Sequence, residues 1–410
     1  VDIAIACAGG VSITIFPTLS NNEVKYILND SKCTVAFVGD KALLKQVKEI
    51  EKDLKSLKTI IVMDMSFKGD KKKVFGIKDC IAIGREWRNN QTNYKKYNKR
   101  KDGVTLDDWF TILYTSGTTG QGKGVILTHW CGSSRLEGTT EYFQRYNFDV
   151  NENDVTLCYL PLSHVFDRGS CQWLAINKGS LICYADKPAT LIEDMQKYNP
   201  TWINCVPRLY EKIYITMQQQ MAENPLQKKL FNWALNVGLQ ALKYREDENG
   251  CYNMHPNFDL KSKLPIWLKI QYSIADKIFA KVRGLFGTRF HHSFSASAAI
   301  SPDLLRFYYA LGLAVIEGYG STESFNAAIL NPITACKPGY MGKEANGSRC
   351  RVAKDGELEL SGAGIFNGYL NKPKETKEVF TRDGWFKTGD IVELSSDGYF
   401  KFIERKKGII

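Results

Sequence analysis

Short apolar runs alternate with amphipathic stretches along the first half of the chain. Runs with β-branched residues predict strands, and apolar positions spaced three and four apart predict helices. The predicted strands are 11–16, 34–38, 59–63, 155–160 and 179–184, and the predicted helices are 21–29, capped by Ser20 or Asn21, 41–55 and 191–198. This alternation predicts helices covering a largely parallel sheet, an α/β fold. The polar, lysine-rich residues 68–105 are expected to form a loop-dominated connection.

The second half of the chain changes its pattern twice. Residues 208–283 have a long helical pattern, interrupted by the polar stretch 246–256. After Pro332, short strand patterns separated by glycines predict a small β-rich subdomain. The strands predicted there are 356–360, 364–369, 389–394 and 398–403. We therefore expect a large α/β part over 1–334 with a helical insert at about 208–283, a β-rich part over 335–404, and a short final segment, 405–410.

Composition narrows the classes of function. Hydrophobic residues make up 44% of the 410 residues, enough for a large core, and the net charge is +11. The basic excess clusters at 71–73, 95–101 and 405–407, which is typical of solvated surface and suits a phosphate-rich substrate. Eleven scattered cysteines without metal-type spacing predict neither a metal site nor disulfides, and favour a reducing compartment. No uninterrupted apolar run is long enough for a transmembrane helix.

Residues 114–124, YTSGTTGQGKG, have the composition of a phosphate-binding loop. Glycines let backbone N–H groups face an anion, hydroxyls add donors, and Lys123 adds a charge. Gly117 and Gly122-Lys123 match the spacing of a Walker loop, but Gly124 stands where that loop needs Ser or Thr. The β-branched residues 125–129 predict a strand rather than the helix that follows a Walker loop. The loop is therefore predicted to bind ATP in a fold other than that of P-loop NTPases.

Three further motifs carry candidate chemistry. In IEGYGSTES, residues 316–324, a glycine-flanked Tyr319 can lie against a base, Thr322 can donate to a phosphate, and Glu323 can hold Mg²⁺. These residues follow an apolar strand predicted at 311–315, and α/β sheets bind ligands where strands end. In WFKTGDI, a turn would present Asp390 to a ribose diol, and the nearby IERKKGI contains Arg405. An ordinary glycine-rich turn, a turn aspartate and a surface arginine are the alternatives for these motifs.

The motif LPLSHVFDR contains His164 between apolar residues. A lone histidine is more often structural than catalytic. A Ser-His-Asp triad of Ser163, His164 and Asp167 is not expected, because neighbours in the chain cannot adopt the relay geometry.

In this order the motifs resemble the adenylate-forming acyl-CoA synthetases, and the resemblance covers essentially the whole chain. It rests on YTSGTTGQGKGVILTH, LPLSHVFDR, EGYGSTES, GELELSGAGIFNGYLN, DGWFKTGDI and ERKK. Within that family, LPLSHVFDR, NCVPRLYEKIY and the helical stretch after it are most similar to long-chain fatty-acid CoA ligases. The resemblance implies the large N-terminal adenylate-forming domain, with mixed, largely parallel sheets flanked by helices plus a small β-rich subdomain. Residues 1–334 would be a partial N-terminal AMP-binding domain, and 405–410 the hinge and start of a C-terminal domain.

The implied reaction joins a fatty acid to CoA at the expense of ATP, with Mg²⁺ as cofactor. The carboxylate would attack the α-phosphate and release pyrophosphate, and the CoA thiolate would then displace AMP. By the match, Lys123 and the loop residues Thr115, Ser116, Gly117, Thr118, Thr119 and Gly120 hold the β- and γ-phosphates, and Thr322 meets the α-phosphate. Glu323, with Thr115, holds Mg²⁺. Tyr319, between Gly318 and Gly320, flanks adenine; Asp390 and Arg405 bind the ribose; His164 lies near the carboxylate; Lys407 is the hinge.

Three positions depart from the family pattern. Gly122 stands where proline is usual, which would make the loop more flexible; Ser295 to Ala299, SASAA, replace SGGAP, which would narrow the acyl or adenine pocket; Ser321 replaces Leu or Met. The chain stops just past the expected hinge, so the resemblance implies that the family's C-terminal domain, with the lysine that completes adenylation, is missing. We therefore expect residues 1–410 alone to bind ATP weakly and turn over poorly.

Other adenylate-forming ligases, namely aryl- or medium-chain acyl-CoA ligases and adenylation domains, and a non-catalytic acyl- or nucleotide-binding relative are the alternatives. We expect fatty acid, ATP and CoA as partners, no nucleic acid, and a cytoplasmic location or a peripheral one on the cytosolic face of a membrane.

Overall fold

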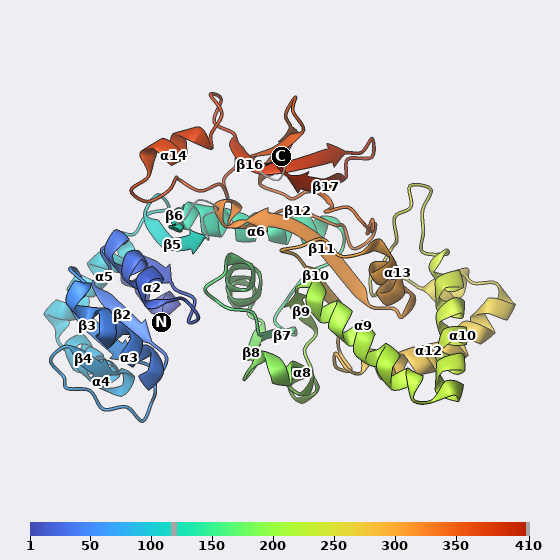
Figure 1. Ribbon diagram of the computed structural model, residues 1–410, viewed down its shortest axis with the longest axis horizontal. Helices are drawn as coiled ribbons and strands as arrows, with labels where there is room; N and C mark the ends of the chain where they lie inside the picture. Colours follow the sequence, from blue (N-terminus) through green and yellow to red (C-terminus); the bar gives the residue numbers. More distant parts are fainter. Residues whose placement is uncertain (116–120, 407–410) are drawn as a thin grey trace. The chain divides into compact units, whose positions relative to one another are not determined.

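The computed structural model describes residues 1–115 and 121–406, which fall into two compact units. The first unit consists of residues 1–132 and 366–378, and the second of residues 133–365 with 379–410. Figure 1 shows the elements of both.

The first unit contains two small sheets. In one, β2 (Val35–Val38), β3 (Thr59–Val62) and β4 (Val74–Gly76) are parallel, with α2 (Asn21–Asp30) and α3 (Lys41–Ile50) contributing to the same core. In the other, β1 (Ser12–Thr14) is parallel to β5 (Trp109–Thr115), which pairs antiparallel with β6 (Lys123–Thr128). This unit also contains α1 (Asp2–Cys7), the 3₁₀ turn η1 (Glu51–Asp53) and α14 (Pro373–Glu378). These elements confirm the strands and helices predicted for residues 11–63.

The start of α2 follows the predicted signal. The Ser20 side chain accepts from the backbone N–H of Glu23, while the Glu23 carboxylate accepts from the backbone N–H of Ser20 at 2.8 Å. This capping box satisfies two N–H groups that a helix start otherwise leaves without partners. Ser20, one of the two predicted caps, is therefore the N-cap.

The prediction of a loop over 68–105 is wrong. This stretch forms β4 and two helices, α4 (Ile77–Asn89) and α5 (Gln91–Asp102), neither of which contains a buried residue. Lys, Arg, Gln and Glu have good helix propensity, so the polarity of the segment reflects exposure to solvent rather than the absence of a helix. The Asn90 side chain caps α5 by accepting from the N–H groups of Thr92 and Asn93.

The second unit is built on a seven-stranded sheet in the order β13-β12-β11-β10-β9-β7-β8. Strands β11 (Ala314–Ser321), β10 (His292–Ser295), β9 (Trp202–Cys205), β7 (Val155–Cys158) and β8 (Leu181–Tyr184) are parallel. β12 (Asn326–Leu330) and β13 (Lys343–Glu344) add antiparallel strands at one edge. Helix α6 (His129–Arg145) crosses the boundary between the units in sequence. The parallel core confirms the predicted α/β class.

The helices of the second unit follow the predicted pattern closely. α8 spans Leu191–Tyr198, as predicted, and the long helical stretch consists of α9 (Pro207–Ala222), α10 (Pro225–Leu242) and α12 (Ile266–Arg283). The polar interruption at 246–256 contains no helix, and the short α11 (Leu260–Lys263) follows it. α10 contacts α9, α12 and α13 (Pro302–Ala310), forming a helical layer (Figure 1). The other helical turns are η2 (Asp167–Trp173), α7 (Leu174–Lys178), η3 (Pro188–Thr190) and η4 (Thr322–Ser324).

A second, four-stranded antiparallel sheet is formed by β14 (Ser348–Val352), β15 (Glu357–Gly362), β16 (Phe386–Leu394) and β17 (Phe400–Arg405). Three of the four strands predicted after Pro332 are confirmed. The strand predicted at 364–369 is wrong: in the described part of the chain, this segment forms only an isolated bridge, between Tyr369 and Val125 of β6. Among the helices of the described residues, none is both long and apolar enough to cross a bilayer.

Candidate active site

The predicted phosphate loop joins two antiparallel strands of the first unit. Thr115 ends β5 and is the register partner of Lys123, which begins β6. A side chain at Gly122 would place its Cβ 2.8 Å from the Thr115 carbonyl oxygen, so glycine allows the strands to meet here. The five loop residues predicted to bind phosphate, Ser116, Gly117, Thr118, Thr119 and Gly120, lie outside the described residues.

Gly124 is enclosed by the side chains around it. A Cβ at this position would lie 3.0 Å from Ile112 Cγ2, 3.1 Å from Tyr114 Cζ and 3.3 Å from Leu370 Cβ. A Ser or Thr, as a Walker loop requires, would therefore force these neighbours apart. The chain continues from Gly124 as strand β6, not as a helix. Both observations exclude the Walker interpretation.

Lys123 is half-buried and lies with its Nζ 4.8 Å from the centre of the Tyr369 ring. A lysine above an aromatic face is attracted by the ring quadrupole, which orients the ammonium group. The sequence offered no signal for Tyr369 as a partner, because more than two hundred residues separate the two positions.

The IEGYGS motif forms part of strand β11 rather than a turn after a strand. β11 runs to Ser321 and pairs antiparallel with β12 from Gly318 onward, with an irregularity between Tyr319 and Gly320. At Gly320 a Cβ would lie 1.9 Å from the carbonyl oxygen of Asn326, so only glycine permits this approach. The expectation that the strand ends at 315 is thus wrong, because the glycines allow β11 to continue and to pair with the antiparallel strand β12. Thr322 and Glu323 follow in the 3₁₀ turn η4.

Asp390 and Tyr319 are joined by a hydrogen bond. The Tyr319 hydroxyl donates to Asp390 Oδ2 at 2.5 Å, and Arg405 Nε lies 3.0 Å from Asp390 Oδ1. Asp390 is buried inside β16, which corrects the expectation of a turn aspartate: Gly389, at φ +75°, allows the strand to continue. Burial raises the pKa of Asp390, opposed by Tyr319 and Arg405. Three residues predicted from separate motifs are therefore brought together.

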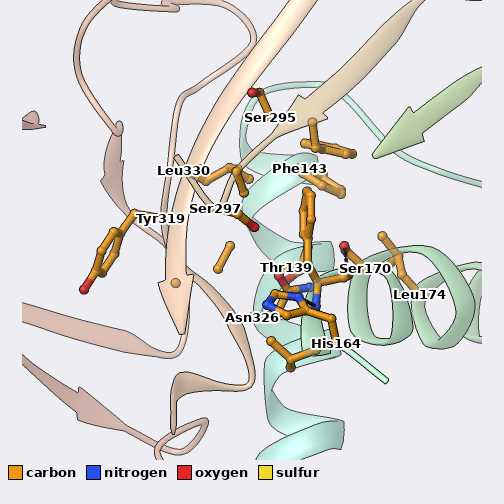
Figure 2. A pocket seen from close by; sticks show the side chains of 17 residues that line it. Thr139, Phe143, His164, Ser170, Leu174, Ser295, Ser297, Tyr319, Asn326 and Leu330 are labelled. Atoms are coloured by element: carbon orange, nitrogen blue, oxygen red, sulfur yellow. Dashed lines mark hydrogen bonds between the residues drawn. The ribbon is translucent and has the colours of Figure 1, made fainter. Parts of the chain in front are cut away.

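A small cavity of about 50 Å³ lies in the second unit. Its walls combine the end of β10 and the SASAA segment with β11, α6 and the turn that carries His164. Figure 2 shows the side chains of Thr139, His164 and Asn326 close to one another, while the ring of Tyr319 points away from them. The apolar part of the wall is formed by Phe143, Val165, Phe166, Leu174, Phe294 and Leu330. The cavity is thus largely apolar, with a few polar groups.

His164 is held as a neutral ring. Its Nδ1 accepts from the backbone N–H of Phe166 at 3.1 Å, and burial lowers its pKa. A neutral imidazole whose Nδ1 accepts carries its proton on Nε2. His164 can therefore act as a hydrogen-bond donor through Nε2 without a charge.

A buried network fixes the turn on which His164 lies. Asp167 accepts from Cys158 Sγ at 3.0 Å, from the backbone N–H of Leu160 at 3.0 Å and from Asn204 Nδ2 at 2.8 Å. Burial raises the Asp167 pKa to about 6, although these donors oppose the rise. Asn204 also donates to Ser170, which lines the cavity. The network holds both ends of the LPLSHVFD turn, a role for Asn204 that the motifs do not indicate.

The comparisons with known proteins agree with this arrangement. A model of the family described as AMP-binding enzyme matches residues 1–370. The chain belongs to the AMP-binding enzyme family. This confirms the resemblance on which the motif interpretation rests.

Curated relatives of this AMP-binding chain are fatty-acid ligases by name. Long-chain-fatty-acid–CoA ligase FadD15 of Mycobacterium bovis is 28% identical over 100% of this chain and 63% of its own length. Long-chain-fatty-acid–CoA ligase 5 of Mus musculus is 30% identical over 97% of this chain and 57% of its own length, and long chain acyl-CoA synthetase 1 of Arabidopsis thaliana is 30% identical over 99% and 61%. The chain therefore spans 57% to 63% of the length of these relatives.

Solved structures share the fold of this AMP-binding chain. ATP-bound MatB from Rhodopseudomonas palustris aligns with a TM-score of 0.66 at 20% identity, covering 100% of this chain and 66% of MatB. The anthranilate CoA ligase AuaEII, in complex with anthranoyl-AMP, aligns with a TM-score of 0.66 at 18% identity, covering 98% and 65%. The predicted fold class, the large domain of adenylate-forming enzymes, is confirmed.

Ser297 is a strained residue in the cavity wall of this AMP-binding chain. It adopts φ +73°, in the left-handed region that favours glycine. We expect Ser297→Gly to raise the free energy of unfolding by about 1 kcal/mol, since the relieved strain exceeds the added entropy of the unfolded chain. Ser297→Ala keeps the Cβ and should give no such gain. Chemical denaturation measures both variants, and equal stability of the two would contradict the strain argument.

The burial of Glu317 leads us to expect that the stability of the fold depends on pH. Glu317 is buried on β11, its Oε2 has no hydrogen-bond partner among residues 1–115 and 121–406, and burial raises its pKa to about 8. Between the ordinary pKa of 4.5 and about 8, the unfolded chain ionises Glu317 while the folded chain keeps the proton. Stability should therefore fall as pH rises through this window, by about 1.4 kcal/mol per unit of pKa shift as an upper bound. Glu317→Gln should flatten this fall and stabilise the fold more at pH 8 than at pH 5; thermal melting at both values tests it.

Proposed function

We propose that the protein activates a long-chain fatty acid in two steps. The carboxylate attacks the α-phosphate of ATP and releases pyrophosphate, and CoA thiolate then displaces AMP from the acyl adenylate. The observation that carries this proposal is the largely apolar cavity between the His164 turn and the glycines of β11. An acyl chain fits apolar walls, and the few polar groups can orient its carboxylate. The names of the relatives support the same substrate class.

Adenylate formation brings two anions together, so neutralising charge is the main catalytic task. We assign the β- and γ-phosphates to Lys123, Thr115 and the loop residues 116–120, and the α-phosphate to Thr322. The position of Lys123 at the start of β6, oriented by Tyr369, supports its part in this assignment.

Glu323 fits a Mg²⁺ site of the kind that uses one or two carboxylates together with substrate phosphates and water. A Mg²⁺ site made of protein ligands alone would require a cluster of acidic residues, and no such cluster surrounds Glu323 among the described residues. We propose that Glu323, with Thr115, holds Mg²⁺, which would supply positive charge to the phosphates.

For the nucleoside we propose Asp390 and Arg405 as ribose ligands and Tyr319, between Gly318 and Gly320, as the adenine neighbour. The hydrogen bond between Tyr319 and Asp390 supports a shared role for this group. Asp390 has a second oxygen, facing Arg405, that can accept from a diol. His164, a neutral donor on the cavity wall, would face the carboxylate or adenylate.

The subdivision of the chain and its location belong to the same proposal. We propose an AMP-binding domain over 1–334, a β-rich subdomain over 335–404 and a hinge at Lys407, which lies outside the described residues. We also propose a location in the cytoplasm or at the cytosolic face of a membrane.

Pyrophosphate release by the intact gene product tests the function directly. We expect it to depend on ATP, Mg²⁺ and a long-chain acid, with palmitate far exceeding octanoate, benzoate and malonate, and thioester formation to require CoA. Preference for benzoate would identify an aryl-CoA ligase instead. Binding of ATP or palmitate without pyrophosphate release would identify a non-catalytic relative.

A further inference from the structure

Helix α12 has two apolar faces, of which the fold covers only one. Leu268, Tyr272, Ala275, Phe279 and Val282 face the core. The opposite face exposes Ile266 by 72%, Trp267 by 53%, Ile270 by 58% and Ile274 by 51%. At 100° per residue, these four side chains fall within about a quarter of the helix circumference. A helix that is apolar all round is normally buried, so the outward face requires a cover.

Lysines border this outward face. Lys277 and Lys281 continue the line of Ile266, Ile270 and Ile274 at helical spacing and are exposed. Lys263 and Lys269, also exposed, lie beside the beginning of the apolar line. The face therefore combines an apolar first half with positive charge around and after it.

The nearby acidic group on α12 does not cancel this charge. Asp276 forms an ion pair with Arg283 at 2.8 Å and lies 3.5 Å from Lys261, so its charge is already balanced within the helix and its neighbour. The four lysines that border the apolar face are left as a net positive field, which selects an anionic partner.

We propose that the outward face of α12 docks on a lipid bilayer that contains anionic phospholipids. Ile266, Ile270 and Ile274 would enter the boundary between headgroups and acyl chains. Trp267 would lie at headgroup level, where its ring is favoured, and the lysines would contact lipid phosphates. This surface lies outside the cavity of the candidate site, and the inference does not rest on the proposed ligase function.

The shape and composition of the face favour a bilayer over a second copy of the chain. Its exposed side chains form a ridge along one helix, and a symmetric contact between two such ridges would bring their lysines together. Apolar residues with tryptophan on one side and lysines beside them are typical of helices that lie in a membrane interface. Charge complementarity therefore points to anionic lipid.

Vesicle sedimentation with the intact gene product tests the proposal. We expect the protein to bind vesicles of phosphatidylcholine that contain about one third phosphatidylglycerol. At low salt, this binding should exceed binding to pure phosphatidylcholine vesicles by about tenfold or more. Ile270→Asp with Ile274→Asp should reduce binding by about tenfold or more, because two charges would have to enter the apolar boundary. Lys277→Ala with Lys281→Ala should reduce the preference for anionic vesicles and its dependence on salt.

Matched controls lie on the exposed helices α4 and α5. Ile81→Asp with Ile83→Asp makes the same change at exposed isoleucines, and Lys95→Ala with Lys99→Ala removes two exposed lysines. Both controls should bind vesicles like the unmodified protein. All variants should retain palmitate-dependent pyrophosphate release at the unmodified level in the absence of vesicles, which separates docking from catalysis.

Three results would overturn the proposal. The first is failure of the unmodified protein to bind anionic vesicles, and the second is equal binding by the α12 variants. The third is a dimer in light scattering that dissociates in the Ile270→Asp, Ile274→Asp variant, which would identify a second copy as the cover of this face.

Discussion

Replacing Lys123 with alanine is expected to reduce fatty-acid-dependent pyrophosphate release by about 100- to 1000-fold, the usual cost of removing one group that stabilises developing charge. Lys123 supplies a fixed positive charge at the start of β6, positioned over Tyr369. The attack of a carboxylate on a phosphate accumulates negative charge, so the loss should appear in kcat and not only in KM for ATP. Steady-state pyrophosphate release at saturating ATP measures the effect.

Stability separates this effect from misfolding. The contact with Tyr369 contributes only about 0.5–1 kcal/mol, so thermal unfolding of Lys123→Ala should remain close to that of the unmodified protein. Lys45→Ala, an exposed lysine on α3, is the matched control and should leave both activity and stability unchanged. A fall in kcat of less than about tenfold, with the fold intact, would contradict the assignment of Lys123 to the phosphates.

The sequence correctly predicted the elements that depend on residues close to one another in the chain, such as helix caps and short periodic segments. Ser20 with Glu23 marks the start of α2, and the period of residues 191–198 matches α8. The β-branched residues 125–129 predicted that the phosphate loop leads into a strand, and β6 confirms this prediction. In each case the decisive residues lie within a few positions of the feature they specify.

Contacts between distant parts of the chain could not be predicted in this way. Tyr369 lies over Lys123, Asn204 donates to Asp167, and Asn326 approaches Gly320, and none of these pairs shares a motif. The extension of β11 through the EGYGS motif depends on β12, whose backbone position the sequence does not encode locally. The prediction for residues 68–105 failed for a different reason: α4 and α5 bury no residue, and their polar, lysine-rich composition is also typical of a loop.

The close approach of Asn326 to Gly320 leads to the second large expected effect, which is on the free energy of unfolding. Gly320→Ala is expected to lower the free energy of unfolding by about 3 kcal/mol or more, because overpacking against rigid backbone has no flexible side chain to move aside. The added Cβ would lie 1.9 Å from the Asn326 carbonyl oxygen and 2.5 Å from its carbon. Asn326 itself stands at φ +93° after Phe325 at φ +45°, so the turn has little room to shift.

Gly84→Ala provides a control with the same chemical change. Gly84 lies in the exposed helix α4, where an added Cβ meets no atom of the described residues within 4 Å. Alanine favours the helix by about 1 kcal/mol over glycine, so this variant should be as stable as the unmodified protein or more stable. Chemical denaturation compares the two variants, and calorimetric titration with ATP should show weakened binding only for Gly320→Ala, since Thr322 and Glu323 follow directly from the displaced strand. Equal stability of the two variants would show that β12 yields at Asn326, and the requirement for glycine at 320 would then be wrong.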